Sequence, residues 1–212
     1  MRYQTTLGLA LAAFAGARAQ STVQTASFAS GGQVLFATNF AQDPLGSFPR
    51  GLKHMRGPLE LVNVDGVPML HAIGPGEFLI PLSQTLPSDF TIEFDFISRT
   101  GAGQEIAFEG GPVATRSVTS AEVLWNHQIA TIMGGGVGMA QITLPSAPQT
   151  QVAGKRTKVQ VAMSGTQFKL FTNGLPLYNL PTLAFQRASE LRIFLGGVSD
   201  GAQAHRHGGR TS

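Results

Sequence analysis

Apolar and polar residues alternate one by one through many short segments of this 212-residue chain. The clearest example runs from Phe90 to Phe96, where Phe and Ile residues alternate with Thr91, Glu93 and Asp95. A β-strand places successive side chains on opposite faces of its sheet, so this pattern predicts a strand with one apolar face. Residues 158–163 show the same alternation. Glu93 and Asp95 are therefore expected together on the solvent face of a sheet.

Two dipeptides mark tight hairpins between such segments. Asp65-Gly66 separates residues 59–64 from 67–73, and Asn173-Gly174 follows residues 166–172. Both dipeptides favour the two-residue turn whose twist matches that of paired strands. Other strands are predicted at residues 34–38, 77–80, 106–108, 122–127, 129–132, 137–144 and 191–195. The rest of the chain lacks the crossover helices of an α/β fold, so the prediction is an all-β antiparallel sandwich.

The first residues have the three-part order of a secretory leader. A basic start with Arg2 precedes the apolar run 7–16, and Ala17-Arg18-Ala19 has the small-x-small pattern of a signal-peptidase site. The run is too short to span a bilayer as a helix, and no integral membrane span is expected elsewhere. We expect residues 1–19 to be a signal peptide and residues 20–32 a polar linker, so that the mature protein is exported, periplasmic or secreted. The alternative is a buried N-terminal helix.

The amino-acid composition argues against nucleic-acid binding and excludes chemistry that depends on Cys. The chain has 15 basic and 12 acidic residues, a formal charge of +3. Arg2 and Arg18 lie in the predicted leader, and Arg206 and Arg210 lie near the other end. The remaining body has 11 basic against 12 acidic residues, so it lacks the clustered positive charge that nucleic-acid binding requires. The absence of Cys excludes disulfides, Cys-based zinc sites and a thiol nucleophile.

Four segments, in this order, resemble one family. They are residues 36–49 (FATNFAQDPLGSFP), 64–70 (VDGVPML), 86–96 (LPSDFTIEFDF) and 169–181 (KLFTNGLPLYNLP). Together they resemble concanavalin A-like, or LamG-like, jelly-roll domains of exported bacterial proteins, in which an OmpA-like domain often follows. The resemblance covers residues 33–201 and implies a two-sheet jelly-roll sandwich.

The chain departs from this family at its last residues. Such domains usually close with a strand that pairs the end of the domain with its start. Residues 202–212 have no apolar alternation, and we expect them to be a disordered tail. A missing closing strand would leave backbone donors and acceptors of a sheet unpaired, and an unfilled sheet edge of this kind invites self-association.

Glu93 and Asp95 also point to a catalytic alternative. Glycoside hydrolases of the laminarinase type, which share the jelly-roll fold, carry E-x-D-x-x-E on one strand, with the nucleophile first and the acid/base last. Here Ser98 stands in the last position. A hydrolase would therefore need a displaced acid, such as Glu105 or Glu109. The other interpretation is a pair of solvent-facing carboxylates balanced by Arg or Lys across the sheet.

Two further groups are candidates for binding. Trp125-Asn126-His127 combines an aromatic ring that can stack on a sugar with polar neighbours. The other interpretation is that the Trp is a core residue. Asn39, Asp43 and Asp200 are candidate ligands for one structural calcium ion, which usually takes about six to eight oxygen ligands. The alternative is that Asp43 caps the Pro-Leu-Gly turn that follows it.

These features predict an exported, non-catalytic β-sandwich that binds carbohydrate or another cell-envelope component. Calcium is the one candidate cofactor. The alternatives are a laminarinase-like hydrolase with an incomplete motif and a structural or assembly module. An enzyme is the less favoured interpretation because the sequence contains no complete catalytic set.

Overall fold

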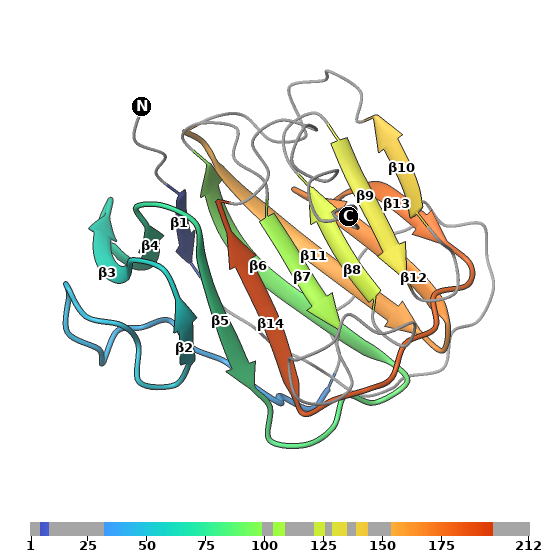
Figure 1. The fold of residues 1–212 in the computed structure, drawn as a ribbon, viewed down its shortest axis with the longest axis horizontal. Helices are drawn as coiled ribbons and strands as arrows, with labels where there is room; N and C mark the ends of the chain where they lie inside the picture. Colours follow the sequence, from blue (N-terminus) through green and yellow to red (C-terminus); the bar gives the residue numbers. More distant parts are fainter. Residues whose placement is uncertain are drawn as a thin grey trace, which may run out of the picture.

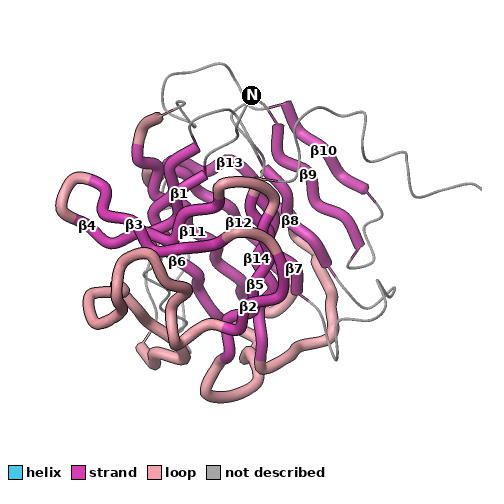
Figure 2. The backbone as a smooth tube through the Cα atoms, turned by 60° about the vertical axis from the view of Figure 1, so that its left-hand side comes forward, coloured by secondary structure: helices cyan, strands magenta, loops and turns pink. Residues whose placement is uncertain are grey.

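The fold is known from a computed structural model that describes residues 5–8, 32–98, 104–108, 121–125, 129–134, 139–143 and 154–196. Within these residues every regular element is a β-strand, and fourteen strands form two seven-stranded sheets (Figure 1). Loops alone connect the strands in this part of the chain (Figure 2). The described strand pairs are all antiparallel. This confirms the predicted all-β antiparallel sandwich.

The first sheet has the strand order β13-β12-β11-β6-β1-β4-β3. Its strands, in chain order, are β1 (Thr5–Gly8), β3 (Leu59–Val64), β4 (Val67–Ala72), β6 (Phe90–Ser98), β11 (Arg156–Ser164), β12 (Gln167–Thr172) and β13 (Leu175–Leu180). The second sheet has the order β10-β9-β8-β7-β14-β5-β2. Its strands are β2 (Lys53–Arg56), β5 (Gly76–Pro81), β7 (Gln104–Phe108), β8 (Ala121–Trp125), β9 (Ile129–Gly134), β10 (Met139–Thr143) and β14 (Glu190–Leu195).

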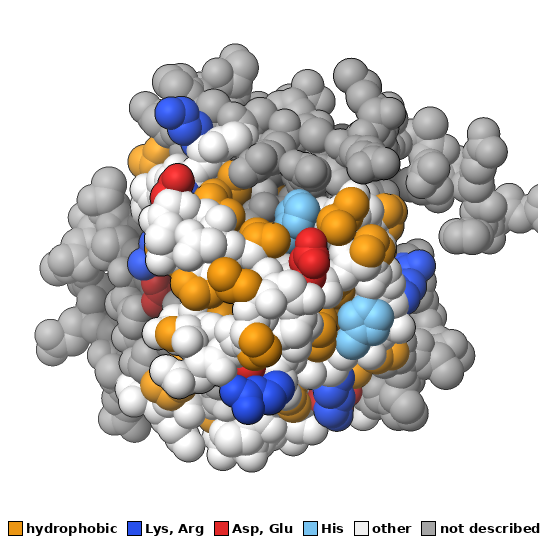
Figure 3. Space-filling view, turned by 90° about the vertical axis from the view of Figure 1, so that its left-hand side faces the viewer, with side chains coloured by type: hydrophobic (Ala, Val, Ile, Leu, Met, Phe, Trp, Pro, Cys, Tyr) orange, Lys and Arg blue, Asp and Glu red, His pale blue; other side chains and the backbone are white. Residues whose placement is uncertain are grey.

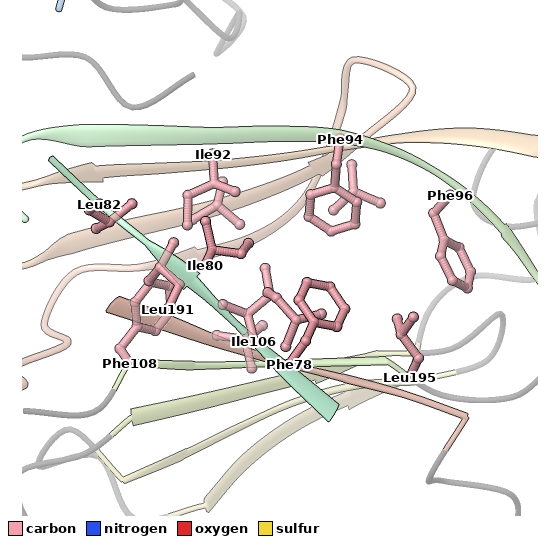
Figure 4. Close-up of a cluster of buried hydrophobic side chains, with 14 of the residues drawn as sticks. Phe78, Ile80, Leu82, Ile92, Phe94, Phe96, Ile106, Phe108, Leu191 and Leu195 are labelled. Carbon is pink, nitrogen blue, oxygen red and sulfur yellow. The ribbon is translucent and has the colours of Figure 1, made fainter. Parts of the chain in front are cut away.

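Side chains from the two sheets pack together in one hydrophobic core. β6 contributes Ile92, Phe94 and Phe96, which lie across the core from Phe78 and Ile80 of β5 (Figure 4). Each of these five residues is at most 4% exposed. Burial of one such side chain stabilises the fold by about 1.5–3 kcal/mol. The alternating pattern of the sequence therefore produces the face that holds the two layers together.

The two predicted hairpins are present where the Asx-Gly dipeptides stand. Asp65 and Gly66 have φ angles of 53° and 83°, and Asn173 and Gly174 have 50° and 78°. Two consecutive residues with positive φ define the turn that suits the right-handed twist of paired strands. In the first hairpin the Oδ1 of Asn63 also accepts a hydrogen bond from the backbone N–H of Gly66, at 2.8 Å.

Two elements differ from the sequence-based expectation. Residues 34–38 were expected to form a strand, but they are irregular; Leu35 is buried, and its backbone oxygen accepts a hydrogen bond from Ser83. β2 was not predicted, because all four of its residues are exposed and no apolar alternation marks it. It pairs with β5 through a register irregularity between His54 and Arg56.

β1 lies within the segment predicted to be a leader. Thr5–Gly8 pairs with β4 on one side and with β6 on the other, so it fills a central position of the first sheet. Of the predicted linker at residues 20–32, only Gly32 is among the described residues, and the tail at residues 202–212 lies outside them. Cleavage after Ala19 stays a prediction. Among the described residues, no helix has the length and hydropathy needed to cross a membrane.

Candidate functional site

The outer face of the first sheet carries a group of polar side chains from β6 and β11. Gln160 lies opposite Glu93, and Lys158 lies opposite Asp95, in the antiparallel pairing of the two strands. Val159, which lies between Lys158 and Gln160 on β11, is fully buried in the core. Alternation therefore sends the polar residues to the other face. This confirms that Glu93 and Asp95 share one face of a sheet.

Both carboxylates are held by cations from the neighbouring strand. The Nζ of Lys158 lies 3.1 Å from Oε2 of Glu93, and the Nε2 of Gln160 donates a hydrogen bond of 3.3 Å to the same oxygen. Nη1 of Arg156 lies 3.6 Å from Oδ2 of Asp95. We call these five residues the β6–β11 polar cluster. It is the arrangement expected for strand carboxylates balanced across the sheet.

The β6–β11 polar cluster is partly enclosed. The side chain of Lys158 is 52% exposed, whereas that of Glu93 is 14% exposed. Gln160 is buried, and so is Phe171, its partner on β12. Buried polar groups interact more strongly with their partners than exposed ones because water screens them less. The cluster thus presents a carboxylate and an amide, already oriented by hydrogen bonds, beside more exposed charged groups.

The geometry of β6 does not match a retaining glycosidase. Glu93 and Asp95 are two residues apart on one strand, a separation of about 6.6 Å along the backbone, and both are paired with cations. Ser98, at the last position of the motif, is the final residue of β6 and carries no carboxyl group. Glu105, one of the candidate displaced acids, belongs to β7 in the second sheet. Glu109 is outside the described residues.

The candidate calcium ligands take part in a turn. Oδ1 of Asp43 lies 3.0 Å from Nε of Arg50 and accepts a second hydrogen bond from the Arg50 backbone N–H. Oδ1 of Asn39 accepts a hydrogen bond from the backbone N–H of Ala41 at 3.1 Å. In the part of the chain that the structure describes, no three His, Asp or Glu side chains are grouped as metal ligands. Asp200 lies outside that part, and the calcium site stays a prediction.

The Trp125-Asn126-His127 segment is described only in part. Trp125 is the last residue of β8, with Gln104 and Ala130 as its partners on the two neighbouring strands. Its position has the same parity as Val123, which is fully buried. Both interpretations of Trp125, a ring that stacks on a sugar and a core residue, stay predictions. Asn126 and His127 are not among the described residues.

Arg187 was not identified as an important residue from the sequence pattern. Its guanidinium carbon lies 5.3 Å from the centre of the Phe185 ring and 5.9 Å from that of Phe90. The same group donates hydrogen bonds to the backbone oxygens of Pro87 and Gly165. Burial lowers the pKa of Arg187, and the charge of Asp89 opposes this change. Arg187 therefore joins three loops at one end of the sandwich, and no local pattern marks an isolated Arg for this role.

A second charged group lies on the outer face of the second sheet. Glu77 of β5 is 5% exposed and forms ion pairs with Arg56 of β2, at 2.5 Å, and Arg192 of β14, at 3.1 Å. Burial raises the pKa of Glu77, but the hydrogen bonds and charges of the two Arg residues outweigh it and hold the pKa below its ordinary value. Arg56 also lies over the ring of Phe194, at 5.2 Å. The group ties three strands together, and we assign it a structural role.

Apolar side chains are also visible on the side of the molecule formed by β2, β3 and β4. Figure 3 shows them distributed among polar and charged groups on this side. Exposed apolar residues of these strands include Met55 of β2 and Val67 of β4. A mixture of this kind is ordinary for a protein surface and marks no binding site by itself.

Comparison with protein-family models and with curated proteins gives no match for this sequence. Among solved structures, part of a sialidase resembles this fold, with a TM-score of 0.52, 14% sequence identity, and coverage of 77% of this chain and 15% of that chain. A carbohydrate-binding module (CBM66) from Bacillus subtilis has a TM-score of 0.46, 13% identity, and coverage of 69% of this chain and 88% of that chain. The β-glucanase of Bacillus licheniformis has a TM-score of 0.47, 12% identity, and coverage of 72% and 82%.

The chain is a jelly-roll sandwich of two antiparallel sheets. This agrees with the fold implied by the four sequence segments. At these identities the likeness concerns the fold alone, because one fold supports many unrelated functions. The function of this jelly roll must therefore be argued from its own side chains.

Proposed function

We propose that this protein is an exported, non-catalytic jelly-roll module that binds carbohydrate or another cell-envelope component through the outer face of its first sheet. The observation that carries the proposal is the β6–β11 polar cluster. Glu93 is held by Lys158 and Gln160, and its side chain is 14% exposed. An oriented carboxylate and amide on a sheet surface are suited to hydrogen bonding with the hydroxyl groups of a sugar.

Ion pairing favours binding over hydrolysis. A retaining glycosidase needs one carboxyl group that stays protonated long enough to donate a proton, and a second one about 5–5.5 Å away. Here Glu93 forms an ion pair with Lys158 and Asp95 forms one with Arg156, and β6 and β11 carry no further carboxyl group that could serve as the second catalytic acid. The resemblance of four segments to LamG-like domains of exported proteins supports the envelope as the place of action.

A glycan array and a polysaccharide pull-down with the full chain test the proposal. Retention on an envelope or matrix polysaccharide is expected, followed by a loss of affinity in Glu93→Gln. A hydrogen bond to a charged group contributes about 1.5–3 kcal/mol, which corresponds to a roughly 10- to 100-fold weaker Kd. Glu190→Gln is the matched control, because Glu190 pairs with Lys53 on the other sheet. No retention on any glycan, or equal losses in both variants, would contradict the proposal.

The hydrolase alternative makes a separate prediction. An enzyme would release reducing ends from β-glucan, and Glu93→Gln would abolish that release while the protein still bound the polymer. We expect the wild-type chain to release none at protein concentrations that give saturated binding. Turnover that depends on Glu93 would overturn the non-catalytic assignment and leave the sugar-binding assignment in place.

A further inference from the structure

The first sheet is held together at its centre by a short strand from the start of the chain. Thr5, Thr6 and Leu7 pair with Ala72, His71 and Leu70 of β4, and Thr5–Gly8 pairs with residues 95–98 of β6. Within the described residues, β4 and β6 pair with β1 and not with each other. The β3–β4 hairpin is therefore joined to the remaining four strands of its sheet through β1 (Figure 1).

The position that β1 fills is lined by the core. Leu7 stands in register between Leu70 and Phe96, which are both 0% exposed. Ala72, the partner of Thr5, is 1% exposed. Without a strand here, these apolar side chains would meet water, and the facing backbone groups of β4 and β6 would lose their partners. Both changes are unfavourable. An extended segment with an apolar residue at the place of Leu7 is therefore favoured between β4 and β6.

β4 and β6 both extend beyond the residues that pair with Thr5–Gly8. The described pairing of β1 reaches Leu70 on β4 and Asp95 on β6. β4 continues beyond Leu70 to Val67, and β6 continues beyond Asp95 to Phe90. A longer segment running antiparallel to both strands would gain further backbone hydrogen bonds that the four residues of β1 do not make.

The covalent connection of β1 to the sandwich is long. Residues 9–31 separate it from Gly32, where the continuous described chain begins, and the predicted cleavage after Ala19 falls inside this connection. Removal of residues 1–19 would therefore take β1 away from a sheet whose neighbouring strands remain.

We propose that the slot between β4 and β6 is a strand-acceptor site for an extended peptide of another polypeptide, and that Thr5–Gly8 occupies it only while the leader is attached. The donated strand runs antiparallel to both neighbours and places an apolar side chain between Leu70 and Phe96. Addition of a strand to a sheet in this way is a known mode of peptide recognition, in which backbone hydrogen bonds supply affinity and alternate side chains supply specificity. The proposal does not depend on sugar binding.

The first experiment uses the full chain. Leu7→Asp introduces a charge at the register position between Leu70 and Phe96, whereas Leu7→Ile keeps that position apolar and serves as the control. Hydrogen–deuterium exchange at residues 70–72 and 95–98 is expected to accelerate at least 10-fold in Leu7→Asp and to stay unchanged in Leu7→Ile. Unchanged exchange in Leu7→Asp, with the fold intact by circular dichroism, would show that β1 does not fill the slot and would overturn the proposal.

The second experiment tests acceptance of a peptide in trans. A synthetic peptide of residues 3–10 (YQTTLGLA) is expected to bind Leu7→Asp with 1:1 stoichiometry and to restore slow exchange at both segments, whereas a scrambled peptide is not. If Leu7→Asp does not fold, a specific protease site introduced after Ala19 allows the folded chain to be nicked instead. The labelled peptide should then replace the nicked segment. The proposal would be overturned if the peptide neither bound Leu7→Asp nor replaced the nicked segment. It would also be overturned if the protein formed a dimer that the peptide did not dissociate.

Discussion

Lys158 Nζ lies 3.1 Å from Glu93 Oε2, on neighbouring strands of the first sheet. Because the Lys158 side chain is 52% exposed, water and salt screen this pair, and we expect it to contribute no more than about 1 kcal/mol to stability. The pair acts instead by orienting the carboxylate of Glu93 within the β6–β11 polar cluster. Loss of the ion pair is therefore expected to affect ligand binding by Glu93 more than the stability of the fold.

Lys158→Glu should destabilise the fold more than removal of the charge alone, because two carboxylates would then lie side by side. The loss, measured by urea denaturation, should be about 1 kcal/mol in low salt and should shrink in 1 M salt. Lys155→Glu, with the same change of charge three positions earlier, is the control. Equal, salt-independent losses in both variants would show that the contact with Glu93 is not responsible.

Glu77→Gln should remove much of the acid sensitivity of the protein. The pKa of Glu77 is held below its ordinary value by Arg56 and Arg192, despite the opposing effect of burial. A group with a lowered folded-state pKa adds stability above its unfolded pKa, about 4.3, and this contribution is lost as pH falls through the folded-state pKa. Urea denaturation between pH 7 and pH 3 measures the change.

The wild type should lose stability over this acid range, and Glu77→Gln should lose less while being weaker at pH 7. Glu60→Gln, a substitution on β3 of the first sheet, is the control and should follow the wild-type pH profile. The assignment of the acid-sensitive contribution to Glu77 would be wrong if the two variants had the same pH dependence.

Phe78→Ala should strongly destabilise the sandwich. Phe78 is 0% exposed and packs between the two sheets (Figure 4). Replacement of a buried Phe by Ala costs about 3–5 kcal/mol, through lost burial and the cavity left behind. Val67→Ala, at a position that is 38% exposed, should change stability by less than about 0.5 kcal/mol. Chemical denaturation at pH 7 compares the two, and similar values would contradict the placement of Phe78 in the core.

Gly174→Ala should destabilise the β12–β13 hairpin although space for a methyl group exists. No atom lies within 4 Å of the position that a Cβ would take, but Gly174 has a φ of +78°. An L-residue in this left-handed conformation costs about 1–2 kcal/mol. Gly51→Ala is the matched control, because its nearest neighbour would be the Phe36 ring at 3.8 Å and its φ is not positive. Thermal unfolding should show a lower Tm for Gly174→Ala alone.

Local pattern accounts for much of the fold. Alternation in residues 90–96 correctly assigned Glu93 and Asp95 to the face opposite the core, since strand geometry alone decides this. The Asp65-Gly66 and Asn173-Gly174 turns could also be predicted from a few neighbouring residues. By contrast, β2 has no apolar pattern, and residues 34–38 have one but are irregular. Whether these residues form a strand depends on whether another segment of the sheet can pair with them. A local pattern does not contain that information.

The sequence by itself determined the class of fold, the two hairpins and the face on which the residues of the alternating strands stand, because these follow from backbone geometry over a few residues. Beyond the two hairpins, tertiary structure alone decided which strands became neighbours. It brought β11 beside β6, so that Lys158 and Gln160 meet Glu93, and it seated Thr5–Gly8 between β4 and β6. Such pairings are selected by burial of the whole core, a property of residues far apart in the chain.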